Sequence, residues 1–141
     1  WNAPLSLSAS SRSAWSWPNG RPLTLSIIWI AVMLTYLLGD VIRIFAGDVT
    51  LGEIRGAKFT QGMALGIAAL MVTPILMVVL SLVLPHPINR WVNIVVAALW
   101  FVFNLVGLPT YRGHYDRFLL AVSMVFNLVT IWYAWNWIGI L

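Results

Sequence analysis

Four long apolar runs dominate the pattern of hydrophobic and polar positions along the chain. They cover residues 23–45, 61–84, 91–108 and 115–137, each to within a residue or two. Each run is close to the roughly 20 residues that an α-helix needs to cross a hydrocarbon core about 30 Å thick. The runs also lack the strict alternation of a membrane β-strand. The pattern therefore predicts four transmembrane helices, in which every backbone group finds its partner inside the segment.

The polar connections between these runs are short. They comprise residues 46–60, 85–89 and 109–114. Short connections place consecutive helices side by side and antiparallel. We therefore expect an all-α membrane protein, an up-down-up-down bundle of four transmembrane helices within residues 23–141. Residues 1–22 are rich in Ser, are punctuated by Pro and Gly, and show no helical or strand period. We expect them to form an irregular N-terminal arm.

Composition supports the membrane interpretation. Hydrophobic residues make up 61% of the chain and charged residues only 9%, whereas a soluble domain carries about 25% charged residues. The net charge of +4 is scattered along the chain, without the basic patch that nucleic-acid binding requires. The expected partners are therefore the lipid bilayer and other membrane proteins, including further copies of the chain, and no nucleic acid.

Asp40 and Arg43 are the charged residues inside the first apolar run. At positions i and i+3 they can form an ion pair on one helix face. Asp40 lies deeper than Arg43, and intramembrane acids normally face the bundle interior, so we expect it to face the other helices. Asn104 is predicted at a similar depth, and Tyr36 one turn further in. These four residues form a candidate polar cluster, interpreted either as a lock between helices or as a small proton-handling pocket.

Two features indicate helix packing. Gly62 and Gly66 place small residues four apart in the second run, which permits close approach of another helix within the bundle or from a partner. Asn127 is predicted near the middle of the fourth run, where an amide can hydrogen-bond across to a neighbouring helix.

Aromatic residues gather near one predicted interface. The set considered comprises Trp91, Trp132, Trp135 and Trp137. Rings of this kind typically sit at the headgroup level, although the same surface could hold a flat ligand such as a quinone.

Reactive motifs are missing from the sequence. It contains no HExxH, no glycine-rich phosphate loop and no Ser/His/Asp set. A metal site needs several clustered ligands, and only His114 with Asp116 come close. There is also no cysteine. We therefore expect no catalytic residue, no metal and no cofactor, and hence a protein that is not an enzyme.

Three stretches, LSIIWIAVMLTYLLGDV, NRWVNIV and IWYAWNW, resemble a bacterial family of small four-helix membrane proteins of unknown function. The resemblance covers about residues 23–137. Its pattern places an acid late in the first helix, matching Asp40, and an Arg-Trp pair at the start of the third, matching Arg90 and Trp91. Members often carry further carboxylates in the second and fourth helices, which we expect this chain to lack.

The resemblance also implies a multi-pass protein of the bacterial inner membrane, with both termini in the cytoplasm. Counting Lys and Arg gives the opposite orientation, because the first and third connections and the run ends beside them hold more of these residues than the other side does. The orientation therefore stays open.

These observations lead to three functional hypotheses. The first is a non-catalytic accessory or scaffold subunit of a larger membrane complex. The second is a small oligomeric transporter or proton-linked carrier centred on Asp40. The third is a binder of a lipid or quinone at the Trp-rich interface.

Overall fold

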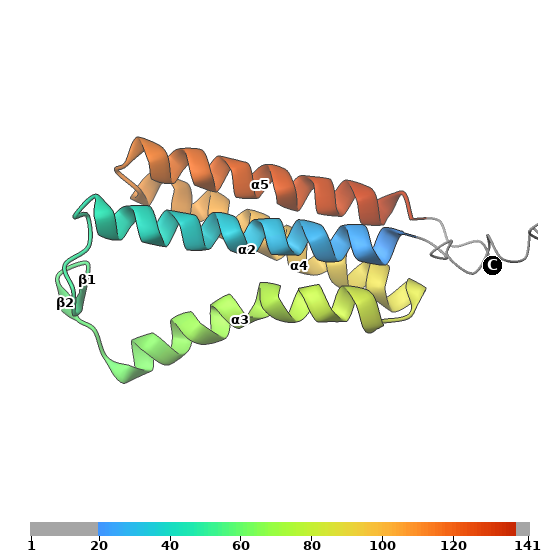
Figure 1. Ribbon diagram of the computed structural model, residues 1–141, viewed down its shortest axis with the longest axis horizontal. Helices are drawn as coiled ribbons and strands as arrows, with labels where there is room; N and C mark the ends of the chain where they lie inside the picture. Colours follow the sequence, from blue (N-terminus) through green and yellow to red (C-terminus); the bar gives the residue numbers. More distant parts are fainter. Residues whose placement is uncertain (1–19, 138–141) are drawn as a thin grey trace, which may run out of the picture.

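The computed structural model of the chain describes residues 20–137. Its long helices are α2 (Arg21–Phe45), α3 (Gln61–Val83), α4 (His86–Gly107) and α5 (His114–Trp135), and the short 3₁₀-helix η1 (Leu108–Thr110) follows α4 (Figure 1). All four long helices are long and apolar enough to cross a membrane. The predicted all-α fold with four such helices is confirmed. Of the expected N-terminal arm, residues 1–19 lie outside the described residues, and its last two residues already belong to α2.

α2 is packed between α3 and α5, and α5 also packs against α4. Contacts between helix ends show the relative direction of neighbouring helices. The hydroxyl of Ser26, near the start of α2, donates to the carbonyl of Val78, near the end of α3. Arg43, near the end of α2, pairs with Asp116, at the start of α5. α2 is therefore antiparallel to α3 and to α5.

The connection between α2 and α3 contains a small antiparallel hairpin, β1 (Glu53–Ile54) with β2 (Ala57–Lys58). Its two turn residues both have positive φ, 53° at Arg55 and 79° at Gly56. This is the backbone twist that a two-residue hairpin turn requires. These two strands were not predicted from the sequence, in which residues 46–60 were interpreted as a polar connection.

α4 begins at His86, five residues before the expected start at 91. The difference arises from the prolines that were interpreted as part of a loop. Pro85 occupies the N-cap, and Pro87 lies in the first turn, where a missing backbone N–H removes no helical hydrogen bond. The earlier start places Asn89 on the helix, one turn before Asn93 and on the same face.

Four buried side chains form what we call the amide junction: Trp29, Ser81, Asn89 and Asn93. The side-chain oxygen of Asn93 accepts from the Trp29 indole at 2.7 Å and from the Ser81 hydroxyl at 3.1 Å. Its amide donates to the side-chain oxygen of Asn89 at 2.7 Å. The amide of Asn89 in turn donates to the Ser81 carbonyl at 2.7 Å. The junction therefore joins α2, α3 and α4.

The interior of the bundle carries polar groups, and its outer surface is apolar. Among residues 20–137, nine polar or charged residues are buried, beside a central apolar cluster of Trp29, Val32, Met77, Ala97 and Trp100. Large hydrophobic side chains are exposed along all four helices. Lipid solvates such an apolar exterior, and polar groups in membrane proteins normally turn towards the bundle interior.

The first half of α3 leans away from α2 and α4 (Figure 1). Pro74 lies inside α3 and removes one helical hydrogen bond, which is a common cause of a bend. Gly62 and Gly66 are exposed on this half, and a Cβ added at Gly66 would meet nothing within 4 Å. Within residues 20–137, Gly62 and Gly66 therefore do not pack against another helix.

The amide junction predicts an asymmetry between two buried tryptophans. Trp29→Phe leaves the Asn93 oxygen without its indole donor, whereas Trp100→Phe removes a similar volume from a ring for which no hydrogen bond is found. Because the Asn93 oxygen keeps the Ser81 hydroxyl, the expected loss is the net value of one hydrogen bond, about 0.5–1.5 kcal/mol. In detergent, unfolding by SDS followed by circular dichroism should show Trp29→Phe to be less stable than Trp100→Phe by about that amount. Equal losses would contradict the role assigned to the junction.

Candidate functional site

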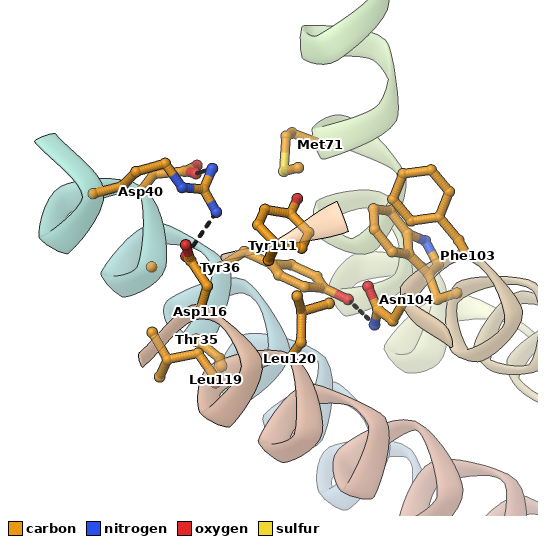
Figure 2. A pocket seen from close by; sticks show the side chains of 13 residues that line it. Thr35, Tyr36, Asp40, Met71, Phe103, Asn104, Tyr111, Asp116, Leu119 and Leu120 are labelled. Carbon is orange, nitrogen blue, oxygen red and sulfur yellow. Dashed lines mark hydrogen bonds and ion pairs between the residues drawn. The ribbon is translucent and has the colours of Figure 1, made fainter. Parts of the chain in front are cut away.

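A cavity of about 80 Å³ lies where α2, α4 and the start of α5 come together. We call it the polar cavity. Figure 2 shows side chains from these three helices converging on it, with Met71 of α3 on one side. Its polar lining consists of Thr35, Tyr36, Asp40, Arg43, Asn104, Tyr111 and Asp116. All four members of the predicted polar cluster are therefore brought to one place.

The charged part of the cavity is centred on Arg43. Its guanidinium lies 2.8 Å from the carboxylate of Asp116 and 3.5 Å from that of Asp40. The Asp116 side chain is 7% exposed and the Asp40 side chain 58%. The guanidinium carbon also lies 4.9 Å from the centre of the Tyr111 ring, which adds a cation–π contact. Asp116 is therefore the closer and better buried partner of Arg43.

Two expectations about carboxylates need correction. Asp40 lines the cavity shared with α4 and α5, but its side chain is 58% exposed, because the buried position on this turn of α2 belongs to Gly39 and consecutive residues point about 100° apart. Asp116 belongs to α5, so the fourth apolar helix does contain an acid.

Gly39 explains why Arg43 can reach α5. A Cβ at this position would lie 3.5 Å from a methyl carbon of Leu119, so α2 and α5 approach closely here. Arg43 is one turn further along the same face. The close approach therefore brings its guanidinium to Asp116 in the first turn of α5.

A second, deeper part of the site is built from hydroxyl and amide groups. The amide of Asn104 donates to the Tyr36 hydroxyl at 2.7 Å and to the Ser123 hydroxyl at 3.1 Å. Ser123 donates to the carbonyl of Leu120 at 2.7 Å. Figure 2 shows Tyr36 and Asn104 meeting across the cavity. These bonds link α2, α4 and α5, and they are separate from the charged groups around Arg43.

Asn127 lies one turn beyond Ser123 on α5 and is fully buried. It adjoins the Tyr36 hydroxyl, but neither its amide nitrogen nor its oxygen has a hydrogen-bond partner among residues 20–137. The expected interhelical hydrogen bond is therefore not made. An unpaired buried amide is costly, and here both polar atoms of Asn127 are left unpaired close to Tyr36.

The four predicted interfacial tryptophans divide into two groups. Trp91, Trp132 and Trp135 are exposed at one end of the bundle. Trp137 is only 5% exposed and lies edge-on to the ring of His86, with centres 4.7 Å apart. Its ring therefore belongs to the core and not to an interfacial surface. Within residues 20–137, no three His, Asp or Glu side chains gather to hold a metal ion.

The buried polar residues of α4 and α5, among them the predicted Asn104 and Asn127, share a helical spacing that can be recognised in the sequence. Asp116, Ser123, Asn127 and Thr130 follow one another at intervals of seven, four and three along α5, and all are buried. On α4 the buried Asn89, Asn93 and Asn104 repeat on one face in the same way. A polar residue at each helical repeat of an apolar run marks the side that turns away from lipid.

Comparison with known proteins gives a family and no activity. The sequence model of a family of unknown function, DUF6326, matches residues 13–137, so the chain belongs to that family. Searches of the curated proteins and of the solved structures found no match.

The two carboxylates predict different stabilities when neutralised. Asp116→Asn leaves a largely buried guanidinium without its close partner, which costs about 3 kcal/mol or more. Asp40→Asn removes a longer, exposed contact, which is worth less than about 1 kcal/mol. Unfolding by SDS of both variants in the same detergent measures the difference. A larger loss for Asp40→Asn would contradict the assignment of Asp116 as the main partner.

Proposed function

We propose that this member of the DUF6326 family is a non-catalytic subunit of a larger membrane assembly, and that a partner helix docks beside the first half of α3. One observation carries the proposal. The Asp40 carboxylate is 58% exposed although α2 is long and apolar enough to span a membrane. A charge that faces lipid is costly, by about 3 kcal/mol or more at the middle of a membrane helix and by less at Asp40, which lies five residues before the end of α2 beside Arg43. A partner that covers the polar cavity removes this cost.

The small-residue face of α3 supports the same site. Gly62, Gly66 and Ala69 are spaced at four and three residues and are all exposed. Small residues at such spacing let two helix backbones approach closely in a membrane, where packing drives helix association. The face lies on the half of α3 that leans away from its own bundle (Figure 1). A docked helix would thus gain contacts with α3 and cover Asp40.

The natural absence of cysteine allows a direct test by crosslinking. Gly66→Cys, labelled in native membranes with a crosslinker that has one thiol-reactive and one photoreactive end, is expected to give a discrete band of higher mass on illumination, because the proposed partner helix would lie against this face. Leu99→Cys is the matched control: it is equally apolar in setting and well exposed on α4, but lies away from this face.

Mass spectrometry of the Gly66→Cys band distinguishes a second copy from a different subunit. Crosslinking that is equal at both positions, or a protein that remains monomeric after gentle extraction, would contradict the proposal.

A second candidate, a proton-linked carrier, is favoured by the composition of the polar cavity. Two carboxylates, Asp40 and Asp116, share one guanidinium, so one carboxylate can gain and lose a proton while the other stays paired. Asp40, the more exposed of the two, would exchange the proton. Tyr36 and Asn104 would continue the polar path towards Asn127. In this hypothesis water, and not a partner helix, covers Asp40.

Proton flux into liposomes tests the carrier. Proteoliposomes with a trapped pH dye and a potassium diffusion potential should acidify faster than empty liposomes if the cavity conducts protons. Asp40→Asn should reduce the rate to that of empty liposomes, because the exchanging carboxylate is gone. Arg112→Gln, which alters an exposed residue at the same end, should leave the rate unchanged. Wild-type liposomes no faster than empty ones would rule out proton conduction.

A further inference from the structure

Arg90 lies beside a pair of exposed indole rings at the Trp-rich end of the bundle. Its guanidinium carbon is 5.8 Å from the centre of the Trp91 ring and 5.5 Å from that of Trp135. The two rings meet edge-on, with centres 6.5 Å apart. The Nε atom of Arg90 is buried and has no hydrogen-bond partner within residues 20–137. We call these three residues the arginine cradle.

The cradle has no carboxylate of its own. All four acids of the chain, Asp40, Asp48, Glu53 and Asp116, belong to the opposite end, where α2 finishes and α5 begins. Arg21, the other described arginine at the Trp-rich end, donates to the Tyr133 carbonyl at 3.2 Å and lies over the Tyr133 ring. Two positive charges thus rest on aromatic rings at this end, with no acidic side chain beside them.

We propose that the arginine cradle binds the phosphate of an anionic phospholipid. A guanidinium presents several N–H donors in a plane and pairs well with phosphate oxygens. The flanking rings hold the guanidinium in place through cation–π contacts. Indole rings also favour the headgroup level of a bilayer, where lipid phosphates lie.

The apolar surface next to the cradle favours a lipid as the ligand over a free phosphate ion. Val95 is one turn after Trp91 on α4, and Trp132 is one turn before Trp135 on α5, and both are exposed. Leu99 and Leu128 continue this apolar surface towards the middle of the bundle. A lipid bound by its phosphate would lay its acyl chains along these side chains, which gain apolar contacts that a free ion does not make.

Native mass spectrometry of the full chain in a neutral detergent tests the proposal. The probes are phosphatidylglycerol and phosphatidylcholine with identical acyl chains. Wild-type protein should bind phosphatidylglycerol more tightly. Arg90→Gln should weaken phosphatidylglycerol binding about tenfold, as expected for the loss of a charge-assisted hydrogen bond. The matched control, Arg112→Gln, removes the same charge at the other end and should retain the wild-type preference.

Three results would overturn the proposal. They are equal binding of the two lipids by wild type, equal losses in Arg90→Gln and Arg112→Gln, and displacement of phosphatidylglycerol by excess inorganic phosphate. The last result would indicate a site for free anions. Circular dichroism checks that Arg90→Gln is folded. If it is not, Trp135→Leu replaces it and should also lower the preference, because it removes one wall of the cradle.

Discussion

The contact between α2, α3 and α4 at one end of the bundle depends on the hydrogen bonds made by the side-chain amide of Asn93. It accepts from Trp29 of α2 and from Ser81 of α3, and it donates to Asn89 on its own helix. Lipid tails are as apolar as the helix surfaces, so moving such a surface from lipid to a helix contact yields little free energy. Packing and interhelical hydrogen bonds therefore hold membrane helices together. A fully satisfied amide at a three-helix contact therefore orients the neighbouring helices as well as joining them. The central apolar cluster shares Trp29 with this junction.

The opposite end is organised differently, and this difference creates the candidate site. There α2, α4 and α5 are joined by Tyr36, Asn104 and Ser123, and by the pair of Arg43 with Asp116. α3 contributes to none of these bonds because its first half has turned away (Figure 1). The polar groups that a fourth helix would cover are consequently left at the edge of a cavity. The two proposed functions differ in what covers that edge, a partner helix in the first and water in the second.

Hydrophobic pattern was sufficient to predict the four helices, because run length and the need to pair backbone groups in lipid leave few other structures. It also gave the depth of Tyr36 and Asn104 correctly enough to bring them together. Depth in the membrane does not tell which way a side chain points around the helix axis. Gly39 occupies the buried position expected for Asp40, because a residue without a side chain lets α5 approach α2. Interpreting Pro85 and Pro87 as loop residues moved the start of α4, and the amide junction was missed with it.

The bend in α3 has a mechanical consequence. The second half of the helix is anchored at the amide junction through Ser81. In the half before Pro74, Leu70 and Met71 still pack against the core, and the preceding residues form an arm that leans away from the bundle (Figure 1). At about 1.5 Å per residue the whole half before Pro74 is roughly 20 Å long, so a rotation of only about 10° at the bend displaces its tip by roughly 3 Å. The bend at Pro74 thus sets where the start of α3 lies. A change in the bend angle at Pro74 would therefore move the hairpin before α3 much further than it would move Met71 at the wall of the polar cavity.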